Sequence, residues 1–355
     1  MDRSRLNLLR LRAAFAREPL AIDESAVSEI VARVRGWDTA DDLLVEPSAE
    51  VIDGYYAARG TGSRSGAVAV VPVHGPIAKR DSMMSMMLGG TSTSRLTATM
   101  RMLAADESVS TILLDVDSPG GIAAGLPELA AEIRRTRESK RVVAIVDDVA
   151  ASAAYWIASQ ADSIVATPES RTGSVGVFVE HVDCSKAMEA EGLAITYIHA
   201  GKYKVEGNPY EPLSDEAEAH IQSIVDNVMG LFVADVAKGR GVTPAQVRSD
   251  FGEGRVLTAK DAKAVGMVDA IATYSETVAR LAGGKSLGMR ADLKWMSEST
   301  FQQVEAEHRD ISGVLAQRAA AFEAQVLSKE AEEAEIVERG PLARTWGWRA
   351  RSVTR

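Results

Sequence analysis

Ser152 is the residue whose type and setting first suggest chemistry. It lies in residues 150–156, Ala-Ala-Ser-Ala-Ala-Tyr-Trp, where an apolar run gives way to an alanine-rich one. We expect a strand before it and a helix after it, so Ser152 has two interpretations. It caps the helix, or its hydroxyl is a nucleophile and the N–H of Ala153 points at the developing oxyanion. Small residues on both sides leave space for a substrate carbonyl.

A second segment, residues 116–121 with the sequence Val-Asp-Ser-Pro-Gly-Gly, also follows an apolar run and precedes a helical pattern. Glycine carries no side chain that would block a close approach to the backbone. Free N–H groups at the start of a helix can bind an anion or an oxyanion. Gly120 and Gly121 are therefore candidates for an oxyanion site, and an ordinary strand-to-helix turn is the alternative.

A serine nucleophile needs a base, and the sequence offers histidines and a lysine. His181 follows Ser152 by 29 residues, which is compatible with a Ser-His-Asp triad, but no local signature supports it. Lys204 lies in residues 201–204, Gly-Lys-Tyr-Lys, after an apolar run. A lysine acts as a base only where its surroundings lower its pKa towards neutrality. An ordinary solvated surface lysine is the alternative for Lys204.

Short apolar runs that alternate with helical patterns must position these residues. The expected strands are residues 67–73, 111–116, 142–146, 163–166, 175–179 and 194–199. The expected helices are residues 96–105, 123–135, 153–158 and 184–191, a long one from Ser214 to about Lys238, and two that begin near Thr243 and Thr258. This alternation predicts an α/β fold with a largely parallel, buried sheet.

Composition divides the 355 residues into three regions. Residues 1–66 form an N-terminal extension that ends in a Gly/Ser/Arg linker, residues 67–284 hold the strand signals, and residues 285–355 form a charged C-terminal extension with helical character over 298–338. The net charge of −10 argues against nucleic acid as a partner. Arginines interrupt residues 1–20, so no signal-peptide core is recognisable, and no run of about 18 apolar residues could cross a bilayer. These features predict a soluble, intracellular protein without a membrane anchor.

The four segments 118–121, 150–156, 172–176 (Thr-Gly-Ser-Val-Gly) and 201–204 occur in an order that strongly resembles the signal peptide peptidase A family of serine peptidases. The resemblance covers about residues 67–282 and implies a crotonase/ClpP-like core of repeated ββα units. It implies that Ser152 is the nucleophile and Lys204 the general base. Gly120 or Gly121 would supply one oxyanion amide, and Ser174 would lie close to the dyad. Many relatives have Gly-Gly after the nucleophile, where this chain has two alanines, which affects the shape of the pocket.

The same resemblance carries expectations about biology. Residues 70–77, Val-Val-Pro-Val-His-Gly-Pro-Ile, resemble the branch found in tailed bacteriophages, whose members process head proteins during capsid maturation. It implies polypeptide substrates such as scaffold, capsid or portal proteins, a host-cytoplasm or procapsid location, and no metal or cofactor. Relatives form rings in which the lysine can come from a neighbouring subunit, so a homo-oligomer is expected.

Three other functions are compatible with parts of the sequence. An acyl-CoA hydratase or isomerase shares the fold and also holds an oxyanion with two amides, but its serine and lysine motifs would be coincidental. A catalytically idle head-assembly protein would use residues 1–65 and 285–355 to bind its partners. A bacterial peptide-degrading relative of the same peptidase family is the third.

Overall fold

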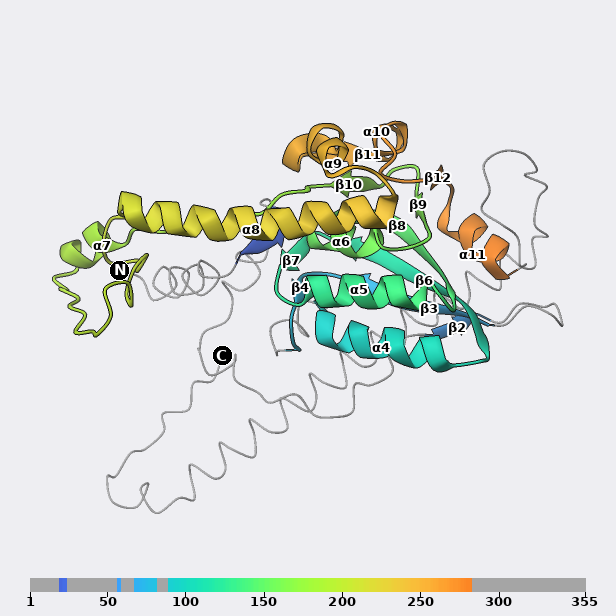
Figure 1. Ribbon diagram of the computed structural model, residues 1–355, viewed down its shortest axis with the longest axis horizontal. Helices are drawn as coiled ribbons and strands as arrows, with labels where there is room; N and C mark the ends of the chain where they lie inside the picture. Colours follow the sequence, from blue (N-terminus) through green and yellow to red (C-terminus); the bar gives the residue numbers. More distant parts are fainter. Residues whose placement is uncertain (1–18, 24–55, 59–66, 82–88, 283–355) are drawn as a thin grey trace, which may run out of the picture. The chain divides into compact units, whose positions relative to one another are not determined.

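The structure of the protein is a computed structural model that describes residues 19–23, 56–58, 67–81 and 89–282 (Figure 1). Its main sheet has the strand order β11-β10-β8-β6-β3-β2, and β9 pairs with β8 and β12. The central pairs β3–β6, β6–β8 and β8–β9 are parallel, whereas β2 and β11 pair antiparallel at the ends. The strands are β2 (Tyr56–Ala58), β3 (Ala67–His74), β6 (Val109–Ser118), β8 (Arg141–Ala151), β9 (Ser163–Ala166), β10 (Arg171–Gly173), β11 (Val256–Thr258) and β12 (Ala270–Ile271).

A second, smaller sheet has the order β1-β7-β4-β5. Its strands are β1 (Leu20–Ile22), β4 (Ile77–Ala78), β5 (Thr91–Ser92) and β7 (Gly120–Ile122). Long strand β3 is followed by short strands and then α4 (Thr93–Ala105), and β6 is followed by β7 and then α5 (Leu126–Thr136). This succession is the expected ββα repeat, so the predicted fold class is confirmed. In the third unit β8 leads directly into α6 (Ala153–Ala158).

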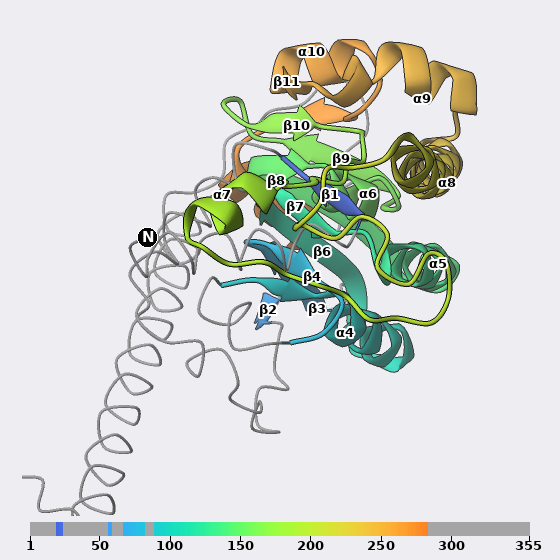
Figure 2. The ribbon, with the colours of Figure 1, turned by 90° about the vertical axis from the view of Figure 1, so that its left-hand side faces the viewer.

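Helices cover both faces of the main sheet. Helices α4 and α5 lie together with α8 (Asp215–Arg240) on one side, as Figure 2 shows, and they enclose the larger apolar core with α6. Helix α11 (Tyr274–Ala282) packs on the opposite face, where it contacts β3 and β8. The remaining helical elements are α7 (Ser185–Ala190), α9 (Pro244–Asp250), the 3₁₀ turn η2 (Gly252–Gly254) and α10 (Ala259–Ala264).

Helix α8 holds α6 in place through its C-terminal half. The Trp156 ring stacks on Phe232 with a centroid distance of 4.4 Å and an interplanar angle of 6°. The Trp156 indole Nε1 also donates to Asp235 Oδ2 at 3.0 Å, and the same carboxylate pairs with Arg134 of α5 at 3.0 Å. A buried carboxylate needs such partners. Asp235 therefore links α5, α6 and α8. The start of α6, where Ser152 lies, is thereby fixed against the sheet.

Two expected strands are not strands in the structure. Residues 175–179 make one isolated bridge, in which Phe178 pairs with Leu20, and residues 194–199 have no regular structure although they are described. The second segment is exposed and has no sheet edge beside it. Since a strand needs a partner for its backbone groups, apolar residues alone did not produce one here.

Several expectations lie outside the described residues. These are the helical character of residues 298–338, most of the N-terminal extension and the whole of residues 285–355. The domain boundaries at residues 66 and 284 therefore stay predictions. Within the described residues, no helix combines the length and the apolar character that a membrane span requires.

Candidate active site

Ser152 lies at the junction of β8 and α6 in a strained backbone conformation. Its φ of 56° and ψ of −116° fall outside the regions that residues with a side chain ordinarily adopt. Its side chain makes no capping hydrogen bond to α6, so the structure does not support the interpretation of Ser152 as a simple helix cap. The Ser152 N–H donates to Gly173 O at 2.8 Å, which fixes the turn. Strain of this kind costs on the order of 1–3 kcal/mol and is often found at functional sites.

The hydroxyl of Ser152 points away from the helix that follows. Ser152 Oγ donates weakly to Gly176 O, at a long 3.5 Å, and the residue is 0% exposed. The N–H groups in the first turn of an α-helix have no acceptor within the helix. Ala153 is the first residue of α6, so its N–H has no acceptor within the helix and is a candidate oxyanion donor.

Gly120 and Gly121 form the facing side of the site. The β6–β8 register places Ser118 opposite Ala150, so the glycine turn lies beside the end of β8. The Gly120 N–H already donates to Ser118 Oγ at 3.2 Å. Because Ser118 belongs to the same turn, this partner stays with the Gly120 amide, and we regard the Gly121 amide as the better oxyanion candidate.

Both positions require glycine. Gly120 has a φ of 101°, and a Cβ on Gly121 would lie 1.9 Å from Ile77 O. A side chain at Gly121 would push β7 away from β4, and one at Gly120 would push it away from β1 and β8. The small sheet thus fixes the position of the two amides relative to Ser152.

Ser174 lies beside Ser152 at the edge of the sheet. Strands β8 and β10 run parallel with Gly173 opposite Ala151, so the residue after each strand end is a serine. Ser174 also has a positive φ, 53°, and its N–H donates to Arg255 O at 2.8 Å. The two serines therefore leave neighbouring strands at the same edge of the sheet.

Lys204 belongs to a different part of the molecule. Residues 183–214, which include α7, extend beyond the sheet at the N-terminal end of α8 in Figure 1, and we call them the arm. Lys202 and Tyr203 both hydrogen-bond Glu216 in the first turn of α8, whereas α6 packs on Phe232. These two positions on α8 are 16 residues apart, which is roughly 24 Å along the axis at 1.5 Å per residue.

The structure therefore does not bring Ser152 and Lys204 together within one chain. Lys204 is exposed, and Ser152 is fully buried. A general base must come within about 3 Å of the proton that it removes. In this structure, Lys204 is therefore not placed to act as the base of Ser152 in its own chain.

The neighbouring lysine, Lys202, is less suited to act as a base. Hydrogen bonds with Tyr203 and Glu216 raise the pKa of Lys202 above its ordinary value. A raised pKa keeps the ammonium charged, and a charged amine cannot accept a proton. Lys204 has no such ion pair among the described contacts.

The histidines of the described residues do not form a Ser-His pair. His181 Nε2 lies 3.2 Å from Asn208 O, and His74 pairs with Asp115 at 3.4 Å. The structure does not bring His181 to Ser152, so the expected alternative of a triad lacks support there. Within the described part of the chain, no three His, Cys, Asp or Glu side chains gather in a way that could hold a metal ion.

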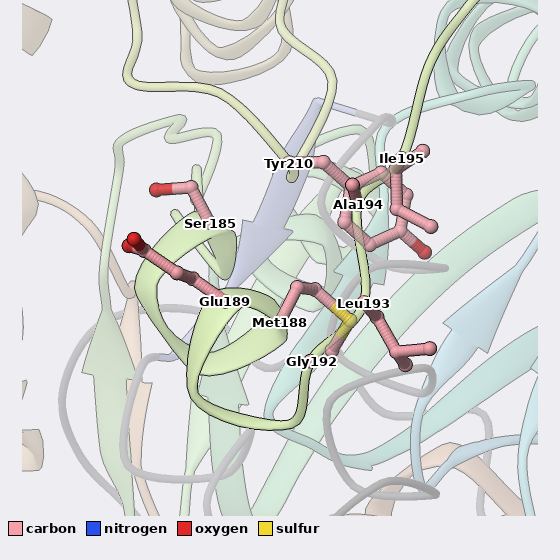
Figure 3. A pocket seen from close by; sticks show the side chains of 8 residues that line it. All are labelled: Ser185, Met188, Glu189, Gly192, Leu193, Ala194, Ile195 and Tyr210. Carbon is pink, nitrogen blue, oxygen red and sulfur yellow. The ribbon is translucent and has the colours of Figure 1, made fainter.

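The hollows on the arm are separate from Ser152. Figure 3 shows one that is lined by α7 and the segment that follows it, with Met188, Leu193 and Tyr210 among its lining residues. A second hollow lies beside residues 201–204, which we call the lysine loop. Its lining residues include Lys202, Tyr203 and Glu216. Neither is lined by Ser152. They are features of the arm and do not form a pocket around the serine.

Sequence reasoning missed the segment that lies over the glycine turn. Strand β1 pairs antiparallel with β7, and Leu20 also pairs with Phe178. Its three residues, Leu20, Ala21 and Ile22, are buried. The apolar triplet after an arginine-rich stretch was the only available signal, and it is too short to predict a strand.

The chain is similar to several known proteins. The family model described as "Peptidase family S49" matches residues 134–288. The chain is 31% identical to "Capsid assembly protease C" of Escherichia phage lambda over 70% of its own length and 57% of that protein. It is 32% identical to "Head-tail preconnector protein GP5" of Enterobacteria phage P21, over 70% of its own length and 49% of that protein. Residues 134–288 are thus similar to peptidase family S49.

The S49 match includes β8, α6 and the lysine loop, and thus both Ser152 and Lys204. The chain spans about half the length of these phage relatives. Among solved structures, a mutant of ClpP1 from Listeria monocytogenes superposes on 59% of this chain and 94% of that one, with a TM-score of 0.37 and 14% identity.

Proposed function

We propose that this protein is a serine endopeptidase of family S49 in which Ser152 is the nucleophile and a second copy supplies Lys204 as the base. The observation that carries the proposal is the backbone of Ser152. Ser152 has a positive φ and an uncapped hydroxyl, and we assign the amides of Gly121 and Ala153 to its oxyanion site. Strain at this position is hard to explain by packing alone, because a glycine would adopt the same backbone at less cost.

The proposed reaction proceeds in two halves. The neutral amine of Lys204 accepts the Ser152 proton while Oγ attacks the peptide carbonyl. The amides of Gly121 and Ala153 stabilise the oxyanion, and loss of one such donor costs about 3–4 kcal/mol of transition-state stabilisation. As the tetrahedral species collapses, the Lys204 ammonium protonates the leaving amine. Water then attacks the acyl-enzyme, its proton passes to Lys204, and Ser152 is regenerated.

A homo-oligomer would complete the site. Lys204 is exposed on an arm that also exposes apolar side chains, which are expensive to leave in water. The exposed apolar residues of the arm are Leu193, Ile195, Tyr197, Ile198 and Tyr203. Contact between this surface and a second copy would bury them and bring Lys204 towards a neighbouring Ser152. An isolated monomer should then have little activity.

The substrates proposed here are phage head proteins. One relative is named a capsid assembly protease and another a head-tail preconnector protein. By this analogy, scaffold, capsid or portal polypeptides are cleaved inside the assembling particle in the host cytoplasm. A catalytically idle head component is the second candidate, because Ser152 and Lys204 lie apart within one chain.

Labelling with a fluorophosphonate probe tests the proposed activity. The probe reacts with activated serines, so the assembled wild-type protein should become labelled at Ser152, as mass spectrometry of the modified peptide would show. Lys204→Arg should abolish labelling, because a guanidinium does not lose its proton in this range. Lys202→Arg is the matched control and should keep labelling near the wild-type rate.

Two outcomes would contradict the proposal. Equal labelling of the Lys204→Arg and wild-type proteins would remove Lys204 from the mechanism. Absence of labelling in the assembled wild type, together with normal head assembly by Ser152→Ala, would favour the idle head component.

A further inference from the structure

A segment near the N-terminus of the chain runs through the candidate site as an extended strand. The Leu20 N–H donates to Phe178 O at 2.9 Å, and the Phe178 N–H donates to Leu20 O at 3.1 Å. On its other edge the segment pairs with β7, where Asp23 N–H donates to Pro119 O at 2.8 Å and Ala123 N–H donates to Pro19 O at 3.1 Å. Residues 19–23 therefore lie between β7 and the chain that follows Ser174. Figure 2 shows β1 beside β7.

The register of this strand is informative. Hydrogen-bonded and non-hydrogen-bonded pairs alternate along an antiparallel ladder. Because Pro19 and Asp23 take part in the flanking bonds, Ala21, which lies opposite Gly121, occupies the intervening hydrogen-bonded position. The Ala21 carbonyl therefore faces the Gly121 amide, which is the candidate oxyanion donor. A peptide carbonyl awaiting attack would occupy the same position.

The segment also lies against the end of β8. A point at the Cβ position of Gly120 would be 2.4 Å from Ala21 O and 3.0 Å from Ala151 O, the carbonyl that precedes Ser152. On the other side, Ser152 Oγ faces Gly176 O, two residues before the Phe178 that pairs with Leu20. The full burial of Ser152 is consistent with a strand that passes over it.

We infer that residues 19–23 are an intramolecular pseudosubstrate: they fill the groove in which an extended polypeptide substrate binds and must leave before one enters. The inference rests on the proposed peptidase function. Strand addition recognises a peptide through its backbone, and pockets for particular side chains add selectivity. The buried Leu20, Ala21 and Ile22 show what the groove accepts. Competing substrates are extended peptides with a small residue opposite Gly121 and aliphatic residues on both sides of it.

Amide hydrogen exchange on the full-length chain tests whether the groove is filled. The background is Ser152→Ala, so that catalysis cannot alter the chain. Leu20→Pro removes the N–H that Phe178 O accepts, and Leu20→Val is the matched control that keeps it. Exchange at the Phe178 and Ala123 amides should rise by roughly tenfold in Leu20→Pro, since each lost bond allows local opening. It should stay within about twofold of the background in Leu20→Val.

A second variant and a synthetic peptide ensure that the test does not depend on Leu20→Pro alone. Ala21→Asp places a carboxylate at a fully buried position and should release the segment by a different route. A synthetic peptide of residues 17–25 added to Leu20→Pro should restore protection at Phe178 and Ala123. Unchanged exchange at Val143 in β8 would show that each variant is folded.

The inference is overturned if both amides exchange as fast in the background protein as in Leu20→Pro, or if the peptide restores no protection. With Ser152 intact, release of the segment should raise the rate of fluorophosphonate labelling by about the same factor as exchange. If exchange responds as expected but no protein is labelled, the groove is filled as inferred and the proposed peptidase activity is wrong.

Discussion

The contact between α8 and α6 predicts opposite effects for one substitution at two positions of the same helix. Gly239 of α8 lies against the residue that follows α6: an added Cβ would lie 2.1 Å from Ser159 O and 2.8 Å from its carbonyl carbon. Gly230, nine residues earlier in α8, has nothing within 4 Å of the same position. Gly239→Ala should therefore separate the two helices, and Gly230→Ala should not.

The expected magnitudes follow from helix propensity and packing. Alanine stabilises a helix interior by about 1 kcal/mol relative to glycine. Gly230→Ala should raise the free energy of unfolding by up to about this amount. At Gly239 the gain is offset by overpacking, which typically costs about 1–3 kcal/mol and more where the obstacle is backbone. We expect Gly239→Ala to lower the free energy of unfolding by roughly 1–2 kcal/mol net.

Urea unfolding followed by circular dichroism measures both values. Since α6 carries Ser152 at its start, Gly239→Ala should also slow fluorophosphonate labelling, whereas Gly230→Ala should leave it unchanged. Equal stabilisation by the two substitutions would refute the close packing of α8 on α6. Loss of stability without any change in labelling would refute the link between this packing and the site.

Three further effects follow from the structure. Gly121→Ala should lower the rate of peptide cleavage by on the order of 100- to 1,000-fold, measured with the assembled protein, because it displaces an oxyanion donor. Trp156→Phe should lower the free energy of unfolding by about 1–3 kcal/mol in urea titrations, because the buried Asp235 loses a donor. Burial lowers the pKa of His74, but hydrogen bonding and the charge of Asp115 outweigh this, and the net pKa lies above 6.5. The stabilisation by His74 is therefore full below pH 6.5 and is lost as the pH rises through the folded-state pKa. The difference in free energy of unfolding between wild type and His74→Gln should shrink over the same pH range.

Local sequence patterns predicted the elements that carry Ser152. Helix α6 and strand β9 have the predicted bounds, and the caps at Ser214, Thr243 and Thr258 each accept the expected backbone N–H. These features depend on neighbouring residues in the sequence. They could be predicted because propensity, capping and apolar runs all favoured the same assignment.

The missed features depend on contacts between distant residues. Residues 194–199 are as apolar as a buried strand, yet they lie on an exposed arm. Strand β1 has only three residues and forms because β7 and Phe178 provide partners on both edges. The position of Lys204 relative to Ser152 is likewise set by the length of α8. None of these contacts leaves a local pattern in the sequence.

Activity of a mixed assembly tests the shared active site most directly. Ser152→Ala and Lys204→Arg are co-expressed, purified as one oligomer and assayed for peptide cleavage beside each variant alone. Each alone should be inactive, and the mixture should recover activity, because some interfaces join an intact Ser152 to an intact Lys204 from the other copy. A mixture that stays inactive while it co-assembles would contradict a base supplied by the neighbouring subunit.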